Sequence, residues 1–291
     1  MEKIFSFCED YTFCGLENKN YKKAKVVFLP IPFEATVYWK GGTKEGPKKI
    51  IEASRHLELY DEEIKKEIVE FGFFTFPEFE IKKESPRKAI FQIEKIVEKT
   101  IRDKKFPVIL GGEHLITLGS VLAFKKFYQK RNFSILVFDA HCDMRENFEG
   151  TKFHHATVMR RLAKDLKLKI TQVGVRSLSK EEAEFIKKAK NVDVFFGKNF
   201  NAENLIKTLR ENVYLSLDVD VFDPSQVPSV GTPEPGGLNW EEILEILKNV
   251  IKKRKIVGMD VVELSPIPFL EFPNFLVAKL IYKILGYILT A

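Results

Sequence analysis

The sequence contains little cysteine and little histidine. Its 291 residues include three cysteines, Cys8, Cys14 and Cys142, and five histidines. The cysteines form no CxxC pair and their number is odd, which argues against a disulfide framework. We therefore expect the protein to work in a reducing, cytoplasmic environment.

Long apolar runs and linkers are also missing. No run approaches the roughly 18 apolar residues of a membrane span, and the first residues, MEKIFSFCEDYTF, lack the apolar core of a signal peptide. No repeat, low-complexity tract or Ser/Gly linker divides the chain. We expect a soluble protein without membrane contact, folded as one domain over residues 1–291 that can bury a sizeable core.

The charge shows no strong excess of one sign. Charged residues make up 30% of the chain and give a net charge of +6, and Lys and Glu are mixed along the helix-like stretches. Such mixing is typical of a solvated surface rather than of a basic nucleic-acid patch. We expect no nucleic-acid partner.

The sequence does contain a regular alternation of β-branched runs and amphipathic segments. The runs cover residues 24–32, 107–110, 133–138, 170–175, 192–196, 213–219 and 255–264, and the amphipathic segments cover 46–65, 87–104, 115–129, 179–190 and 240–253. This alternation predicts an α/β fold, with a parallel sheet and helices on both of its faces. The Pro- and Gly-rich stretch 223–237, DPSQVPSVGTPEPGG, is predicted to be a long ordered loop, and such loops are often functional.

Three residues of metal-ligand type follow the run FSILVF. In FDAHCDMR, Asp139, His141 and Asp143 alternate with Ala140 and Cys142. Because alternate residues of an extended chain share a face, we expect the two acids and the histidine to point one way and Cys142 to pack as a core thiol. The carboxyl end of a buried strand is where open α/β sheets bind ligands.

Two more strand ends carry the same residue types. Asp218 and Asp220 alternate in VYLSLDVDVFD, and His114 follows PVILGGE. A lone acid pair or histidine at a strand end is usually solvated, but three such ends together favour a metal site. Two divalent ions would balance the four carboxylates, and an oxygen-rich set with imidazole and no thiolate suits Mn²⁺. A metal pair can ionise a bridging water, so the pattern predicts a hydrolase.

Five motifs together resemble a known family. GGEH, DAHCDMR, SLDVDVFDP, VGTPEPGG and DVVELSP are similar, in order and spacing, to the signatures of the ureohydrolases, the arginase and agmatinase family of binuclear manganese enzymes. The resemblance runs from Val26 to Leu285. It implies a three-layer arginase-like α/β fold with a mainly parallel eight-stranded sheet, two Mn²⁺ per subunit, and assembly as homotrimers or homohexamers.

The resemblance also implies roles for single residues. The implied metal ligands are His114 and Asp143 for one ion, His141 and Asp220 for the other, and Asp139 and Asp218 as bridges. Asp143 would in addition orient the hydroxide. Glu263 in VVELSP matches the acid that binds a guanidinium, which offers paired N–H donors to a carboxylate.

The segment KFHHATVMRR matches the family's proton-shuttle region. His155 matches the histidine that passes a proton to the leaving amine, and an imidazole that titrates near neutrality suits this step. His154 is an alternative, although the register of Thr157 favours His155. Arg176 in VGVRS is interpreted as structural or interfacial, because a cation beside a guanidinium would repel it.

The family resemblance leaves the substrate open among several guanidines. Agmatine, cleaved to putrescine and urea, is our first choice. The segment MRENFEGTKFH lacks the Ser-Gly-Asn element that arginases share and that binds the α-carboxylate of arginine. That segment carries Glu146 and Glu149, which we expect to pair with a terminal ammonium, with Arg145 and Lys152 as opposing charges. Aminopropylagmatine, arginine and guanidinobutyrate remain alternatives, and a binuclear phosphohydrolase or an inactive metal-binding homologue are more distant ones.

Overall fold

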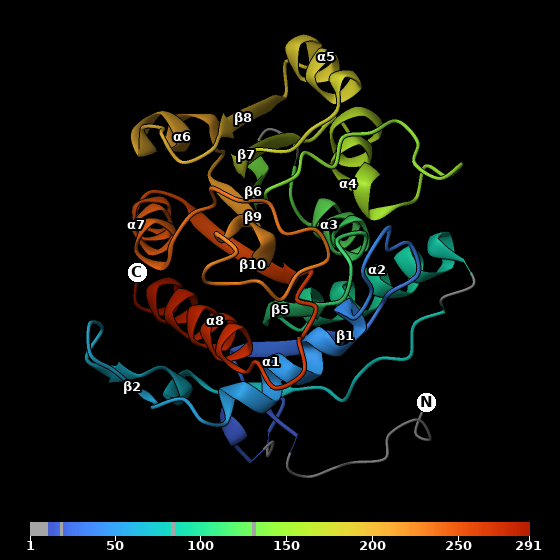
Figure 1. Ribbon diagram of the computed structural model, residues 1–291. Helices are drawn as coiled ribbons and strands as arrows, with labels where there is room; N and C mark the ends of the chain where they lie inside the picture. Colours follow the sequence, from blue (N-terminus) through green and yellow to red (C-terminus); the bar gives the residue numbers. More distant parts are fainter. Residues whose placement is uncertain (1–10, 18–19, 83–84, 130–131) are drawn as a thin grey trace.

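One parallel sheet of eight strands forms the centre of the fold. The computed structural model describes residues 11–17, 20–82, 85–129 and 132–291, so Cys8 lies outside the described residues. The strand order is β4-β1-β5-β10-β9-β6-β7-β8, and all neighbours pair in parallel (Figure 1). The strands are β1 Val26–Ile31, β4 Phe73–Thr75, β5 Phe106–Gly111, β6 Phe133–Phe138, β7 Lys169–Val175, β8 Val192–Phe196, β9 Asn212–Asp218 and β10 Lys255–Val262. The predicted eight-stranded parallel sheet is confirmed.

Seven of these strands coincide with the predicted β-branched runs. The side chains of β1 and β6 are buried at every position, as expected of parallel strands covered on both faces. The eighth strand, β4, was not predicted from the sequence. It has only three residues, FFT, and pairs with β1 at the edge of the sheet, so it is too short to show a period.

Helices cover both faces of the sheet and complete three layers. One face packs against α1 Gly46–Ser54, α6 Ala202–Thr208, α7 Trp240–Ile251 and α8 Phe272–Thr290, and the other against α2 Pro86–Arg102, α3 Ile116–Lys125, α4 Val158–Arg160 and α5 Lys180–Lys188 (Figure 1). Each face has its own apolar cluster, with Leu217 in one and Val137 in the other. The predicted layering is therefore confirmed.

Local capping chemistry fixes where several predicted helices begin. Ser179 and Glu182 form a reciprocal capping box at α5, and Asn239 and Glu242 form one at α7. At α2, Ser85 caps the helix and is followed by proline at the first helical position. These side chains satisfy backbone N–H groups that a helix start would otherwise leave unpaired.

The predicted helix 46–65 is wrong in its second half. Helix α1 ends at Ser54, and a small hairpin follows, formed by β2 Tyr60–Asp61 and β3 Lys66–Glu67. Asp61 accepts hydrogen bonds from the backbone N–H groups of Glu63 and Ile64, and Lys65 adopts a positive φ of 59°. Such local side-chain bonds offer the backbone a turn in place of a helix.

Helix α8 was also not predicted from the sequence. It corrects the statement that no apolar segment approaches the length of a membrane span. By length and composition this helix of 19 residues could cross a membrane, yet 67% of its most apolar window is buried inside the fold. It packs against α1 and α7. Its buried Lys283 is ion-paired with the buried Asp61 of the hairpin at 3.1 Å. Most of this apolar helix is therefore packed inside the fold as a core helix.

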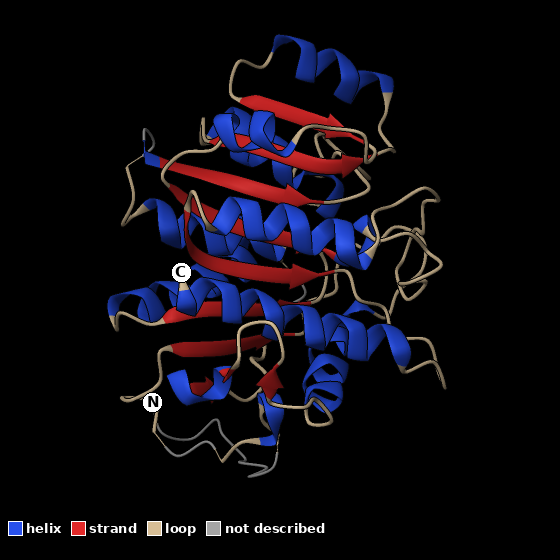
Figure 2. Cartoon of the chain, turned by 90° about the vertical axis from the view of Figure 1, so that its left-hand side faces the viewer, coloured by secondary structure: helices blue, strands red, loops and turns tan. Residues whose placement is uncertain are grey.

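The parallel arrangement places the carboxyl ends of all eight strands at the same edge of the sheet. Figure 2 shows the long arrows of the central sheet pointing the same way, with loops at their tips. The four central strands, β5, β10, β9 and β6, are neighbours in that order. Segments that are far apart in the sequence therefore meet at their carboxyl ends.

Candidate active site

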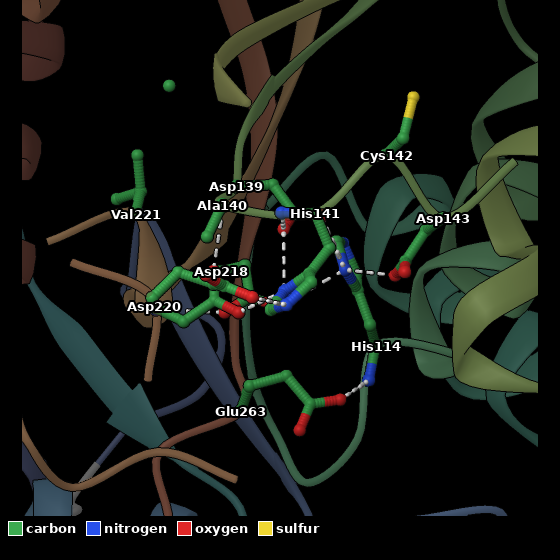
Figure 3. A network of polar contacts seen from close by, with 12 residues as sticks. His114, Asp139, Ala140, His141, Cys142, Asp143, Asp218, Asp220, Val221 and Glu263 are labelled. Atoms are coloured by element: carbon green, nitrogen blue, oxygen red, sulfur yellow. Dashed lines mark hydrogen bonds and ion pairs between the residues drawn. The ribbon is translucent and has the colours of Figure 1, made fainter. Parts of the chain in front are cut away.

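The central strand ends place the predicted ligand residues side by side. Asp139 follows β6, Asp218 ends β9, and Asp220 lies in the 3₁₀ turn directly after it. His114 follows β5, and Glu263 follows β10. Figure 3 shows these five side chains converging on one region.

Two glycines allow His114 to reach this region. A Cβ added to Gly111 would lie 2.2 Å from Cδ1 of Ile116, and one added to Gly112 would lie 2.0 Å from the carbonyl oxygen of Phe33. Both distances are far inside van der Waals contact. At Gly112 the contact is with backbone, so only glycine fits there, whereas at Gly111 the side chains of Ile116 and Val262 would have to move. The close backbone approach joins the β5 turn to the segment after β1 and leaves His114 fully buried.

Three carboxylates surround one nitrogen of His114. Its Nδ1 lies 3.3 Å from Oδ2 of Asp139, 3.2 Å from Oδ2 of Asp143 and 3.3 Å from Oδ2 of Asp218. All four side chains are buried or nearly so. Four polar groups of this kind are gathered in the interior only where a cation or shared protons can compensate their charge.

The second histidine completes the cluster. Nδ1 of His141 lies 2.7 Å from Oδ2 of Asp220 and 3.8 Å from Oδ1 of Asp139. Two ligand groups result, His114 with Asp139 and Asp143, and Asp139 with His141 and Asp220, each with its ligand atoms within 4.8 Å of one another. Asp139 belongs to both. The structure thus brings together all six residues that the sequence predicted as ligands.

The alternation in FDAHCDMR holds for part of the segment. Cys142 points away from the ligand residues (Figure 3), is 1% exposed, and packs in the apolar cluster, as predicted. Burial raises the pKa of its thiol. Asp143 reaches the cluster through a left-handed turn, with φ of 51°, and not through continued extension.

The other ring nitrogen of His114, Nε2, contacts a buried hydroxyl that is itself bound to a buried carboxylate. Nε2 of His114 lies 3.1 Å from Oγ of Ser216, which donates to Oδ1 of Asp260 at 2.7 Å. Asp260 also accepts from Tyr214 at 2.6 Å and from Thr117 at 2.8 Å. Because the Ser216 proton is given to Asp260, its oxygen accepts from Nε2–H, so Nδ1 is the nitrogen of His114 that remains for the carboxylates or for a metal ion. Such partners fix the tautomer of a ligand histidine.

These supporting residues were not found from the sequence. Ser216 and Asp260 each lie between two apolar residues in the interior of a buried strand, β9 and β10 respectively. That isolation is the signal that could have identified them, because a buried acid in a strand needs donors that only the folded chain supplies.

The clustered charges shift the pKa values strongly. Burial, together with Asp220 and Asp143, raises the pKa of Asp139 to about 8. Burial opposes a charge on His141, but Asp220 and Asp139 outweigh it and raise the pKa of that imidazole to about 11. Burial would raise the pKa of Asp220, but the neighbouring His141 outweighs this effect and lowers that pKa to about 2. In the absence of a metal, the cluster therefore compensates its charge by holding protons.

The cluster fits divalent metal ions. Within the described residues, Nδ1 of His114 and Oδ2 of Asp139 are buried without a hydrogen-bond partner, although they face each other. Unpaired buried donors and acceptors are rare and call for a ligand. Carboxylate oxygens with two imidazoles are ligands for a hard or borderline divalent ion.

Glu263 lies beside the metal cluster in a strained conformation. Its φ is 65°, and its Oε1 accepts a hydrogen bond of 2.6 Å from the backbone N–H of His114. Burial and the nearby Asp218 raise its pKa well above the usual range. A non-glycine residue at positive φ is strained and persists only where the surrounding structure enforces it. Glu263 also lines the cavity described below.

Hydrogen bonds through the buried Thr36 and Glu113 position His155. Its backbone N–H donates to Oγ1 of Thr36 at 3.1 Å, and Glu113 accepts from the backbone N–H of Thr36 at 2.7 Å. Burial lowers the pKa of His155 to about 4, so the imidazole is neutral at pH 7. This differs from the expectation from the sequence, which was that His155 titrates near neutrality. His155 lines the cavity.

His154 lies behind its neighbour. It is 1% exposed, its Nδ1 accepts from the backbone N–H of Ala156, and its ring packs against Phe148 at 4.8 Å. It is not among the cavity-lining residues in the described part of the chain. This geometry favours His155 over His154 as the residue that meets a substrate.

A cavity of about 300 Å³ leads from the surface to the cluster. Its lining includes the cluster residues Asp143, Asp218, Asp220 and His141 with His155 and Glu263, and also Tyr38, Trp39, Lys40, Arg145, Thr232 and Glu234. The loop 223–237, predicted to be ordered and functional, thus contributes three cavity residues, Gly231, Thr232 and Glu234. The cavity size suits a small molecule.

The predicted ammonium partners are wrong. Glu146 lies 2.9 Å from Arg160, 3.1 Å from Arg161 and 2.7 Å from Lys164, so its charge is already compensated. The side chain of Glu149 is 54% exposed and faces His154 at 3.6 Å. Within the described chain, neither residue lines the cavity.

Arg176 has a structural role, as predicted. Its guanidinium donates to the backbone oxygens of Gly174, Asp220, Val221, Phe222, Glu234 and Pro235. One side chain thus joins the ends of β7 and β9 to the loop at the cavity mouth. It donates to carbonyl groups and does not face the ligand cluster.

A buried histidine–aspartate cluster at the carboxyl edge of a parallel α/β sheet, open to a small polar cavity, defines a metal-dependent hydrolase. The arginase family model matches residues 24–286. The chain belongs to this family of metal-dependent hydrolases that act on guanidino C–N bonds, as the sequence motifs indicated.

Alignments with named relatives cover nearly the whole chain. An N(1)-aminopropylagmatine ureohydrolase of Synechocystis sp. is 36% identical over an alignment of 279 residues that covers 92% of this chain and 90% of that protein. An agmatinase of Pyrococcus horikoshii is 32% identical over 93% of this chain and 94% of its own length.

Solved structures agree with the fold. The agmatine ureohydrolase of Thermoplasma volcanium has a TM-score of 0.85 and 31% identity, covering 98% of this chain and 95% of its own. A putative agmatinase of Clostridium difficile has the same TM-score and identity, with 92% and 98% covered. An arginase of Bacillus subtilis, at 23% identity and a TM-score of 0.76, shows the shared fold, with 90% of this chain and 98% of its own covered.

The raised pKa values predict how metal stabilisation depends on pH. A raised folded-state pKa contributes stability that is present below the unfolded-state value and is lost as pH rises through the folded-state value. For Asp139 this window runs from 3.8 to about 8, and for His141 from 6.5 to about 11. The metal-free protein should therefore melt at a lower temperature at about pH 8.5 than at about pH 6.

Mn²⁺ should raise the melting temperature more at the higher pH, because fewer protons compete for the ligands. Scanning calorimetry of chelator-treated protein, with and without Mn²⁺ at both pH values, measures this difference. An equal increase at both values, or a larger one at about pH 6, would contradict the assignment of these residues as ligands.

Proposed function

We propose that the protein releases urea from a guanidino amine, with agmatine as the first candidate and N(1)-aminopropylagmatine as the second. The observation that carries this proposal is Glu263, a buried carboxylate that lies beside the ligand cluster and lines the cavity. A carboxylate at this point suits a planar cationic group. Relatives named agmatinase and aminopropylagmatine ureohydrolase support the same substrate class.

The metal ligands are proposed to be the six residues of the cluster. His114 and Asp143 would hold one Mn²⁺, His141 and Asp220 the other, and Asp139 and Asp218 both. When bound, two divalent ions supply Lewis acidity and bring the pKa of a water molecule into the neutral range. The contact of His114 with three carboxylates and the place of Asp139 in both ligand groups support this division.

The protein groups then bind and orient the substrate. Glu263 would hold the guanidinium through its carboxylate, while Asp143 accepts a hydrogen bond from the attacking water. Water adds to the guanidinium carbon, the bond to the alkyl nitrogen breaks, and urea and an amine leave. His155, neutral at rest, would take up the proton that the attacking water loses and give it to the departing amine nitrogen.

Other activities fit the cavity less well. A phosphohydrolase needs cations that clamp a phosphoryl group beside the metals. Here the cavity position next to His114 holds Glu263, and the guanidinium of Arg145 lies over the ring of Phe148 at 5.0 Å. A catalytically inactive homologue would not need His155 and Glu263 on the cavity wall, where both are present.

The proposal extends to the setting of the enzyme. We propose that it works in the cytoplasm as a homotrimer or homohexamer. Two buried free thiols, Cys14 and Cys142, are consistent with a reducing compartment. Exposed aromatic side chains, Phe269, Phe272 and Phe275, provide apolar surface that assembly could cover.

Urea release from a panel of guanidines tests the function. With Mn²⁺ present, we expect kcat/KM for agmatine or its aminopropyl derivative to exceed that for arginine by at least ~10²-fold, because a buried carboxylate without a partner costs several kcal/mol. Guanidinobutyrate should be as poor as arginine. Equal or better hydrolysis of arginine would contradict the substrate while leaving the reaction type intact.

Two neighbouring histidines provide a matched pair for the proton transfer. His155→Ala should retain metal and lower kcat by ~10²–10⁴-fold, the range of general acid–base catalysis. His154→Ala should have a much smaller effect, because His154 lies behind the cavity wall. Elemental analysis and steady-state kinetics of both variants measure this contrast. The reverse order of effects would show that His154 carries the proton.

A further inference from the structure

The cavity has a second carboxylate that the proposed chemistry does not use. Glu234 lines the cavity, and its Oε1 lies 3.8 Å from Nε2 of His141, on the side of that ring away from Asp220. The Glu234 side chain is 34% exposed. Within the described residues, no Lys or Arg nitrogen lies within 4.0 Å of its carboxylate. A negative charge therefore faces the cavity one imidazole ring from the ligand cluster.

The other acids nearby are already engaged. Glu182 also lines the cavity, but it is 3% exposed and accepts from Ser179 at 2.7 Å and from the Met144 backbone at 2.8 Å. Glu146 is held by three cationic side chains. Glu149 lies outside the cavity lining of the described residues. Glu234 is thus the acid in this set that can meet a ligand.

Arg176 holds the backbone of Glu234 in place. Its Nη2 donates to the Glu234 carbonyl oxygen at 2.8 Å and to the Asp220 carbonyl oxygen at 2.8 Å. The same guanidinium therefore connects Glu234 to a residue of the ligand cluster. Asp223 adds hydrogen bonds to the N–H groups of Gly236 and Gly237. Such support reduces the entropy that a binding loop would lose when ligand binds.

Aromatic side chains form another part of the mouth. Tyr38 and Trp39 line the cavity on a segment held at both ends: Glu113 accepts from the N–H of Thr36, and Glu34 accepts from the N–H of Gly42 at 2.6 Å. Trp39 is 72% exposed. Exposed aromatic faces near a carboxylate are favourable surroundings for an organic cation.

We propose that Glu234 binds the ammonium group at the end of the substrate's four-carbon spacer. This rests on the proposed function. In agmatine this nitrogen is the primary ammonium, and in aminopropylagmatine it is the secondary one at the same position, so Glu234 serves both. The guanidinium meets Glu263, the spacer passes His141, and Tyr38 and Trp39 flank the cationic end.

The position also explains discrimination against amino acids. Arginine carries its ammonium on the same fourth carbon, but a carboxylate is attached to that carbon as well. Glu234 would repel this carboxylate and also the acid end of guanidinobutyrate. A fixed like charge against the wrong substrate is an effective specificity element.

Kinetics of Glu234→Gln test the proposal, because the substitution keeps the shape and removes the charge. The pair of substrates is agmatine and butylguanidine, which has the same spacer without the ammonium. We expect kcat/KM for agmatine to fall by ~10–10²-fold, the value of a charge-assisted hydrogen bond. Butylguanidine should change by less than ~3-fold, and arginine should become less disfavoured relative to agmatine. Glu245→Gln, an exposed position on α7, is the matched control.

Two measurements separate the possible outcomes. Metal content reports whether Glu234 instead supports His141 as a metal ligand. Equal losses of kcat/KM for agmatine and butylguanidine, together with reduced Mn²⁺ binding, would overturn the proposal. Unchanged agmatine kinetics, or a selective loss in Glu149→Gln instead, would overturn it too. If the wild type releases urea from no guanidine, the proposed function fails. Calorimetric binding of 1,4-diaminobutane then still tests Glu234, with ~10-fold weaker binding by the variant in support and equal binding against.

Discussion

The structure depends on compensating four carboxylates that are gathered at one edge of the sheet. Asp139, Asp143, Asp218 and Asp220 are all buried, and each is within ion-pair distance of one of two histidines. Without cations, burial and mutual repulsion raise the pKa of Asp139 and Asp218 far above the ordinary values. Divalent ions would remove this conflict, so the same residues that destabilise a metal-free fold would favour metal binding.

The surrounding structure can be understood as support for this cluster. Gly111 and Gly112 allow the backbone approach that brings in His114, and Ser216 with Asp260 orients its imidazole. Arg176 joins Asp220 to the loop of the cavity mouth. Each support is a hydrogen bond or close contact between segments far apart in the sequence. The cavity is therefore preorganised by groups that never meet the substrate.

Much of this could be predicted because strand ends, residue types and motif order are visible in one dimension. The seven long strands and the six ligand-type residues follow from apolar runs that end in acids and histidines. Three-dimensional partners could not be predicted. Glu146 lies close in sequence to His155, but Arg160, Arg161 and Lys164 compensate its charge in the fold. Conversely, Glu234 reaches the cavity from a loop about which spacing said nothing specific. Helix α8 was missed because it is apolar on nearly all sides and shows no amphipathic period.

The number of bound ions tests the central claim most directly. Metal-free protein is titrated with Mn²⁺, and bound metal per chain is determined by elemental analysis alongside urea release. Neutralisation of four carboxylates predicts two Mn²⁺ per chain at full activity, and Asp218→Asn should lower both metal content and turnover. A reproducible content of one Mn²⁺ per chain, with full activity, would contradict the two-metal account.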